Sequence, residues 1–264
     1  MIVLNENAWA AEAIESHNLG KAPFETLRRV ARYYMDEFGY KKYRTRKEVT
    51  AFLLSCEPTA SVPKWADTIE KAIDTAQKHA AINIDHIDVT RAEMDKIDAL
   101  DGVQLQKLAF TLLCLAKYSL AVNPASDGWV WVPVPDIMSM ANITSGVRRQ
   151  SFLFGVLREF GLLQFAKAVD NTNVKVLFLE DGPTVLSVTD LRNLGYQYLM
   201  YHDSPLYFKC EHCGMAVKYN EPETGRKQKY CKECAIRIHM KQMINAVMLK
   251  RMSPRGPSAE AAQS

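Results

Sequence analysis

Four cysteines in the last quarter of the chain have the spacing of metal ligands. Cys210 and Cys213 form one C-x2-C pair, Cys231 and Cys234 form a second, and the stretch 214–230 separates the pairs. Each pair can present two thiolates from one tight turn, and two pairs complete a closed tetrahedral shell around zinc. Gly214, directly after the first pair, permits the backbone conformation that such a turn needs. We therefore predict one structural zinc ion with no open position for water or substrate.

The remaining sulfur and imidazole groups give weaker signals. His212 and His239 lie close enough in sequence to replace a cysteine as ligand, but we expect both to face solvent. Cys56 and Cys114 lie in apolar stretches, which predicts buried free thiols that pack like small hydrophobic residues. A redox-active C-x2-C motif is the alternative for the paired cysteines, but two pairs at this spacing favour a metal site.

Basic residues surround the predicted zinc site. Residues 205–264 contain 11 Lys and Arg against 5 Asp and Glu, whereas residues 1–204 contain 22 against 25. Such a basic terminal module fits phosphate binding, and the alternative is a solvated surface. Tyr219 and Tyr230 could stack on unpaired bases, although packing against the small core is the interpretation we favour. The candidate phosphate-binding residues of this module are Lys218, Arg226, Lys227, Lys229, Lys232 and Arg237.

The middle of the chain, residues 103–204, shows an ordered succession of helical and β patterns. A buried helix is expected at 104–120, and a β-prone run at 129–132. A short helix opens at Pro135, and Ser145 can cap a longer helix that Gly161 ends. The last elements of the pattern are two β runs at 162–169 and 174–179, joined by a turn at 170–173.

The longer helix, residues 145–160, carries the candidate DNA-reading side chains. Its expected core face consists of Leu153, Val156, Leu157 and Phe160. Arginines near the start of such a helix can contact base edges in the major groove. The candidate DNA contacts of this region are Arg148, Arg149 and Arg158 on the helix and Lys167 and Lys175 beside the hairpin. Protein binding by the same surface is the alternative.

Helix, strand, helix, turn, helix and hairpin is the element order of a winged helix-turn-helix domain. Over most of its length, and in the stretch LREFGLLQF, the segment resembles the winged-helix domains of phage replisome organisers and related primosome proteins. That resemblance implies binding to DNA during the initiation of replication. The cysteine pattern, in turn, resembles a zinc ribbon.

Residues 1–84 are expected to form a small helical domain, with amphipathic helices around Leu27–Tyr34, Val49–Leu53 and Trp65–Ala76. The stretches TLRRVARYYMDEFGY, FLLSCEP and WADTIEKAIDTAQK resemble the helical domain that follows the catalytic domain in many phage and plasmid primases. That catalytic domain does not precede it here, so we expect no priming activity. Nine basic residues within residues 21–47 fit either phosphate contact or a solvated helix surface.

The rest of the chain is expected to lack chemistry of its own. Residues 85–102 are acidic and are interpreted as a linker or cap, and residues 253–264 as a disordered tail.

Polar residues interrupt every apolar run before it is long enough to cross a bilayer, so no membrane span is expected. No P-loop, GxGxxG, GxSxG or HExxH motif occurs, and the two aspartates at 85 and 88 lack partner carboxylates. We therefore expect no enzymatic activity.

The sequence predicts a mainly α protein of the α+β class. Its parts are the helical domain (1–84), the acidic linker (85–102), the winged helix-turn-helix domain (103–204), and a zinc ribbon with a trailing helix (205–252). The expected function is non-enzymatic binding of duplex or forked DNA by a phage or mobile-element protein, in replication initiation or a similar step. Replication or host proteins are possible partners, and the expected location is the cytoplasm of a bacterial host. A transcription regulator that binds an operator, and an adaptor or inhibitor of a host enzyme, are the two alternatives.

Overall fold

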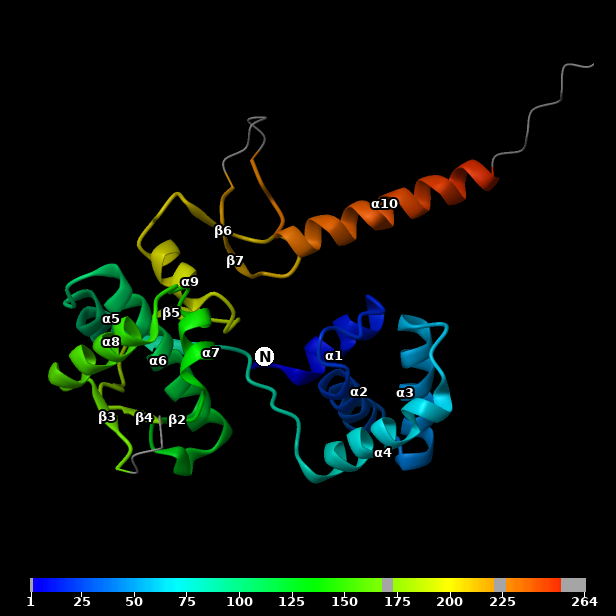
Figure 1. The fold of residues 1–264 in the computed structure, drawn as a ribbon, viewed down its shortest axis with the longest axis horizontal. Coiled ribbons are helices and arrows are strands. Elements are labelled where there is room, and N and C mark those ends of the chain that lie inside the picture. Colours follow the sequence, from blue (N-terminus) through cyan, green and yellow to red (C-terminus); the bar gives the residue numbers. More distant parts are fainter. Residues whose placement is uncertain (1, 168–172, 221–226, 253–264) are drawn as a thin grey trace, which may run out of the picture. The chain divides into compact units, whose positions relative to one another are not determined.

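The chain folds mainly into helices, with three small antiparallel sheets, as the α+β prediction requires (Figure 1). The computed structural model describes residues 2–167, 173–220 and 227–252. It divides into two compact units, Met1–Gly195 and Tyr196–Ser264, which are described separately. The second unit therefore begins at Tyr196 instead of the expected Pro205. The predicted tail, 253–264, lies outside the described residues.

The first unit begins with four helices that enclose a core of their own: α1 (Glu6–Glu15), α2 (Pro23–Phe38), α3 (Lys42–Cys56) and α4 (Val62–Lys78). Three of these match the predicted amphipathic helices, whereas α1 was not expected. The apolar stripes face inward, and the fully buried side chains include Leu27, Val30, Val49, Leu53, Ile73 and Ala76. This repeated i, i+3, i+4 burial is what the sequence pattern predicts for amphipathic helices.

The acidic segment at 85–102 is part of the fold, which corrects its interpretation as a linker. It contains β1 (Ile87–Thr90) and α5 (Arg91–Asp98), and β1 pairs antiparallel with β5 (Thr184–Val188). Thr90 and Glu93 form a capping box at the start of α5. The buried Glu93 carboxylate also accepts from Lys117 Nζ at 2.7 Å and from the Glu180 amide at 3.0 Å. The acids of this segment thus fasten it to later parts of the unit.

The central helix α6 (Val103–Val122) forms the core of the following part of the unit. Its fully buried side chains include Leu108, Phe110, Leu112, Leu113 and Leu115. It is also long and apolar enough to cross a membrane, which corrects the expectation that no segment is. In its most apolar stretch, 61% is buried inside the protein. A core helix explains this apolar composition, because core helices are rich in buried apolar residues.

Five further elements surround α6: β2 (Trp129–Val130), α7 (Val134–Met140), α8 (Val147–Glu159), β3 (Leu163–Phe165) and β4 (Val174–Val176). The three strands form one antiparallel sheet in the order β2-β4-β3. Strand β2 therefore pairs with β4, the second strand of the β3–β4 hairpin, so that the three strands make a single sheet. Most of the predicted turn at 170–173 lies outside the described residues.

Helix α8 differs from its prediction at its start and on its core face. Gly146 is the N-cap residue, and the Ser145 hydroxyl that was expected to cap the helix is buried without a hydrogen-bond partner in the described residues. Phe160 was expected in the core but is 58% exposed, and Phe154 is buried in its place. At Gly161 the backbone has a φ of +71°, which ends the helix as predicted.

Gly195 closes this unit by packing directly against the turn after α7. A Cβ atom at this position would lie 1.9 Å from the Ala141 carbonyl oxygen. Nearby, the Asn142 side chain donates to Asn193 Oδ1 at 2.9 Å, and the buried Lys107 donates to the Asn142 carbonyl oxygen at 2.6 Å. Burial lowers the pKa of Lys107. Only a glycine permits this close approach of the two backbone segments.

The second unit is built on a short hairpin and a long helix. It contains most of α9 (Leu194–Tyr201), then β6 (Tyr207–Lys209), β7 (Ala216–Lys218) and α10 (Lys232–Met252). Strands β6 and β7 pair antiparallel. The Phe208 and Tyr219 rings stack with their centroids 4.5 Å apart. The hairpin and the start of α10 carry the four paired cysteines.

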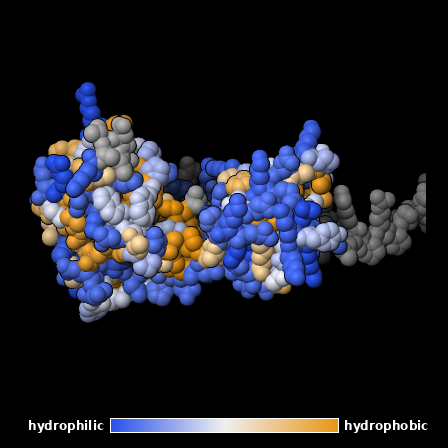
Figure 2. Space-filling model, turned by 90° about the horizontal axis from the view of Figure 1, so that it is seen from below, coloured by the Kyte–Doolittle hydropathy of each residue, from blue (hydrophilic) through white to orange (hydrophobic). Residues whose placement is uncertain are grey.

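Large apolar side chains also reach the surface. In Figure 2, orange apolar groups lie among blue hydrophilic ones on the face that is shown. The exposed examples that matter below are Trp131, Val147 and Phe152 in the first unit and Ile236, Met240, Met243 and Ile244 on α10. Single exposed apolar residues are common, but grouped ones indicate a binding surface.

Candidate metal centre and nucleic-acid interface

The four paired cysteines meet at one point and could hold a metal ion. Their Sγ atoms all lie within 4.8 Å of one another, and those of Cys213 and Cys231 are 3.9 Å apart. Four sulfurs at about 2.3 Å from a tetrahedral ion lie about 3.8 Å from each other. Cys210, Cys231 and Cys234 are buried, and Cys213 is half-buried. The donor set and spacing therefore fit a metal ion with four thiolate ligands.

Two local structures position these ligands. In the β6–β7 hairpin, the Gly214 amide donates to the Cys210 carbonyl oxygen at 2.9 Å, and Gly214 has a φ of +70°. The Cys210 amide in turn donates to the Met215 carbonyl oxygen at 2.9 Å. The second pair lies at the start of α10, where the Ala235 amide donates to the Cys231 carbonyl oxygen at 2.9 Å. The turn predicted from Gly214 is thus present.

Backbone amides point at the sulfur atoms. The Cys231 amide donates to Cys210 Sγ at 3.3 Å, and the Cys234 amide donates to Cys231 Sγ at 3.4 Å. Burial disfavours ionisation of Cys210, but amide donors outweigh burial and lower its pKa to about 6. Burial and the neighbouring thiols of Cys231 and Cys213 instead raise the pKa of Cys234. Four thiolates this close together need a cation between them, since otherwise their charges repel.

Arg237 belongs to the metal centre. Its Nη2 atom lies 3.5 Å from Cys234 Sγ, one helical turn earlier on α10. A guanidinium at this distance offsets the negative charge of the thiolate. Sequence reasoning assigned Arg237 to DNA, and the i, i+3 spacing from Cys234 was the signal for this contact. His212 and His239 are exposed, and the metal-binding group found among the described residues consists of cysteines alone.

The remaining basic residues of the second unit lie on its surface. Lys218, Lys227, Lys229 and Lys232 are exposed. Lys229 lies 3.6 Å from Glu211, an exposed pair that holds each partner only weakly. Arg226 lies outside the described residues. Tyr230 packs against the cysteines and Tyr219 stacks on Phe208, in agreement with the structural role that we favoured for both tyrosines.

On α8, the predicted DNA-reading arginines are exposed. Arg149 lies over the Phe152 ring at 5.0 Å and reaches Gln104 Oε1 at 3.4 Å, while Arg158 lies over the Phe165 ring at 5.3 Å. No carboxylate of the described part of the chain forms an ion pair with Arg148, Arg149 or Arg158. Their charge remains available to an external anion.

The two lysines at the hairpin differ. Lys167 is exposed and has no ion-pair partner in the described chain, whereas Lys175 forms an ion pair with Asp127. The Asp127 side chain is 73% exposed, so this pair is open to exchange with other anions. Within the described residues, Lys167 is therefore the one of the two lysines without an acidic partner.

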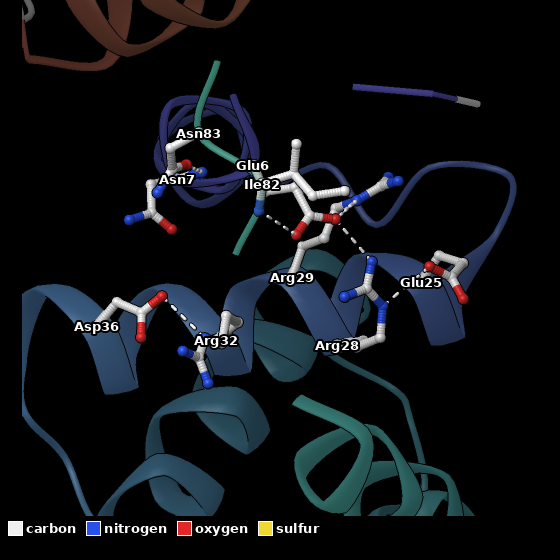
Figure 3. A network of polar contacts seen from close by, with 9 residues as sticks. All are labelled: Glu6, Asn7, Glu25, Arg28, Arg29, Arg32, Asp36, Ile82 and Asn83. Carbon is white, nitrogen blue, oxygen red and sulfur yellow. Dashed lines mark hydrogen bonds and ion pairs between the residues drawn. The ribbon is translucent and has the colours of Figure 1, made fainter. Parts of the chain in front are cut away.

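The N-terminal arginines, by contrast, are bound by acids (Figure 3). Arg28 Nη2 lies 2.7 Å and Arg29 Nε lies 3.0 Å from the same oxygen of Glu6, which is buried. Glu6 also accepts from the Ile82 amide at 3.3 Å, and Arg28 pairs with Glu25 at 3.0 Å. Burial alone would raise the pKa of Glu6, but the two guanidinium groups lower it overall. Figure 3 shows these side chains converging from α1 and α2.

The next cations along α2 and α3 are also paired. Arg32 Nε lies 2.9 Å from Asp36 and its Nη1 donates to the Ala76 carbonyl oxygen at 2.9 Å. Lys42 pairs with Asp74, and Arg46 pairs with Glu70. Of the nine basic residues at 21–47, five thus have acidic partners in the protein. Lys21, Lys41, Arg44 and Lys47 are exposed. The pairing favours a structural role for this cluster over phosphate contact.

The two remaining cysteines show no activation. Cys114 is fully buried, and burial raises its pKa; burial also raises the pKa of the half-buried Cys56. A nucleophilic cysteine needs a lowered pKa, which neither of these thiols has. Cys114 is therefore the buried thiol that the sequence predicted, whereas Cys56, also predicted to be buried, is only half-buried against the helical core.

Comparisons of the chain with protein-family models, with curated proteins and with solved structures gave no match. The site and its interpretation therefore depend on the residues and their geometry.

Proposed function

We propose that the chain binds DNA through a winged helix-turn-helix domain and carries a structural zinc ion in a basic zinc ribbon. Zinc is the metal we propose, because four thiolates in a tetrahedral arrangement are its usual structural ligand set. The shell is closed, so the ion would stabilise the hairpin and the start of α10 and would take no part in a reaction.

The arrangement of α6, β2, α7, α8, β3 and β4 supports the winged helix-turn-helix assignment. The elements follow in the order of such a domain, and the sheet order β2-β4-β3 joins the strand after the first helix to the hairpin. In this assignment α8 is the recognition helix. Its inner face is fixed by the buried Leu153, Phe154 and Leu157, which leaves the opposite face to contact DNA.

The single observation that carries the proposal is the state of the arginines on α8. Arg148 and Arg149 lie in the first turn of the helix and are exposed, without a carboxylate partner in the described chain. Residues in this part of a recognition helix contact base edges, and arginine pairs well with guanine. Arg158, Lys167 and the exposed lysines of the ribbon then supply contacts to the backbone phosphates.

The proposed biological role is a non-enzymatic step in the replication of a phage or mobile element, in the cytoplasm of a bacterial host. The sequence resemblance to replisome organisers and the combination of a winged helix with a basic ribbon support it. Duplex or forked DNA would be the substrate. Preference for one duplex sequence, without affinity for forks, would instead support a transcription regulator.

A binding titration with the full chain tests the proposal. The affinity for a labelled duplex is measured by fluorescence anisotropy at salt concentrations from about 50 to about 200 mM. Even two phosphate contacts predict a decrease of about tenfold across this range, because each contact releases counterions. Weak binding that does not depend on salt would contradict the proposal.

The apolar stripe on α10 favours a second candidate, a protein-binding adaptor. Ile236, Met240, Met243 and Ile244 are each more than half exposed and recur at helical spacing. Such a stripe can lie in the groove of a partner protein. The adaptor hypothesis predicts that the salt titration detects no affinity for DNA and that substitution of Met240 by Lys abolishes partner binding.

A further inference from the structure

The outer face of the three-stranded sheet carries the half-buried Trp129, and the exposed Trp131 follows it in the chain. Trp129 pairs with Lys175, and Lys175 pairs with Gln164, so these three side chains lie on one face of the sheet. Their neighbours Val130 and Val174 are buried on the opposite face. Trp131, two residues after Trp129, is 52% exposed. This face of the sheet thus combines tryptophan rings with a lysine and an amide side chain.

These residues line a shallow, open concavity of about 440 Å³. Its lining residues are Trp129, Trp131, Gln164, Phe165, Lys167 and Asn173, together with Ala166. We name this group the aromatic wing face. Among the described residues, three aromatic rings, two amide side chains and one cation line it, and no carboxylate does.

We propose that the aromatic wing face binds unpaired bases of a nucleic-acid strand, next to the duplex held by α8. This inference depends on the proposed function, which it extends by naming a single-stranded segment as part of the substrate. In a duplex, the neighbouring base pairs cover both faces of each base. An unpaired base has a free face that can stack on an indole ring. Base stacking on aromatic side chains is tolerant of sequence, since every base has an aromatic face.

The charges around the concavity match a polyanion. Lys167 lies at its rim and Arg158 lies over the Phe165 ring. Lys175, between Trp129 and Gln164 on the same face, is paired with the exposed Asp127. The amide groups of Gln164 and Asn173 can donate to and accept from base edges. A protein partner would be held by apolar packing, which does not require a cation beside each aromatic ring. The chemistry of the face therefore favours nucleic acid.

The test uses the full chain and a labelled oligo(dT) strand, with the blunt duplex of the same length in parallel. Substitution Trp131→Ala removes an exposed ring outside the strands, so the fold is expected to be retained, which thermal unfolding verifies. We expect the affinity for oligo(dT) to fall about tenfold, as for loss of one stacked base, and the duplex affinity to change less than twofold. The variant Trp131→Phe retains a ring and should keep most of the affinity.

A matched control is Tyr43→Ala, since Tyr43 is an exposed aromatic residue on α3, 79% accessible, outside this face. It should leave both affinities unchanged. Quenching of tryptophan fluorescence by oligo(dT) gives a second readout, and it should decrease in Trp131→Ala. Unchanged oligo(dT) affinity and quenching in Trp131→Ala would overturn the inference and assign the face to a protein partner. The proposed function is tested by a different result. If it is wrong, the unmodified chain shows no salt-dependent binding to the duplex.

Discussion

Two groups of arginines, one on α2 and one on α8, look alike in the sequence but differ in the structure. Arg28, Arg29 and Arg32 each contact a carboxylate of the protein, and two of them share the buried Glu6. Arg148 and Arg149 are exposed and contact an aromatic ring or an amide at most. The first group holds helices together, whereas the second leaves positive charge at the surface.

The difference teaches that the density of basic residues alone does not identify a phosphate-binding surface. The deciding feature is whether acids lie within reach in the fold. Glu6 lies on α1, a different helix from the arginines it binds, and Asp74 and Glu70 lie on α4, opposite Lys42 and Arg46 on α3. On α8, Arg149 instead contacts Gln104 and the Phe152 ring, and Arg158 lies over the Phe165 ring.

The largest effect is expected from removal of the proposed zinc ion, because that ion would fix the cations of the proposed ribbon. Zinc binding by such sites contributes about 10–16 kcal/mol, which is also folding free energy. Chelation, or the substitution Cys213→Ser, should therefore unfold the hairpin and the start of α10, as measured by circular dichroism and amide hydrogen exchange. The matched control is Cys56→Ser, which should leave zinc content unchanged. Full amide protection of residues 207–218 after chelation would contradict the metal assignment.

The next effect concerns the acid-bound arginines. The substitution Glu6→Gln removes the buried carboxylate that Arg28 and Arg29 share, and breaking a buried ion pair in this way typically costs about 3–5 kcal/mol. Urea denaturation should detect this loss, without a change in DNA affinity at temperatures where the variant is folded. Glu25→Gln is the control, because Glu25 is 46% exposed and its pair with Arg28 should contribute less than about 1 kcal/mol. Equal losses in both variants would show that Glu6 is not the special partner.

A smaller effect is expected on DNA affinity from the unpaired arginines. The double substitution of Arg148 and Arg149 by Ala should lower duplex affinity by about tenfold to a hundredfold, measured by anisotropy at fixed salt. The matched control replaces Lys42 and Arg46 by Ala, which removes the same charge from a region where acids neutralise it. That control should change the affinity less than twofold. Equal losses of duplex affinity in the two double variants would mean that DNA affinity depends only on the total charge of the protein.

The smallest effect is on the pH dependence of stability. Because the arginines lower the folded-state pKa of Glu6 below its ordinary 4.5, its stabilisation is present above that pH and is lost as the pH falls through the folded value. The free-energy difference between the protein and Glu6→Gln should therefore shrink below about pH 4.5. Denaturation at pH 7 and at pH 3 measures it, and a constant difference would contradict the ionised state of Glu6.

Local patterns were sufficient for a large part of the fold. The cysteine pairs, the turn at Gly214 and the helices α2 and α4 depend on residues close in sequence, and spacing alone located them. The capping box of Thr90 and Glu93 was also a local signal, and it could have predicted α5 where a linker was expected.

The rest depended on contacts between distant segments. Strand β1 pairs with β5, which follows only after the whole of the central helix and the three-stranded sheet, and the partner of Arg28 and Arg29 lies on α1. Phe160 and Phe154 both fit an apolar helix stripe, and only the packing against neighbouring elements buries one and exposes the other. The β-prone run at 129–132 indicated a strand but not which of its faces would be covered.

The most direct test of the account is the slope of log affinity against log salt for duplex binding by three proteins: the unmodified chain, the Arg148 and Arg149 double variant, and the Lys42 and Arg46 double variant. Loss of two cations from the DNA-facing side of α8 should reduce the magnitude of the slope in the α8 variant alone, because cations held against the duplex release condensed counterions. A slope that is the same in all three proteins, or reduced equally in both variants, would contradict the claim that the unpaired arginines of α8 bind DNA.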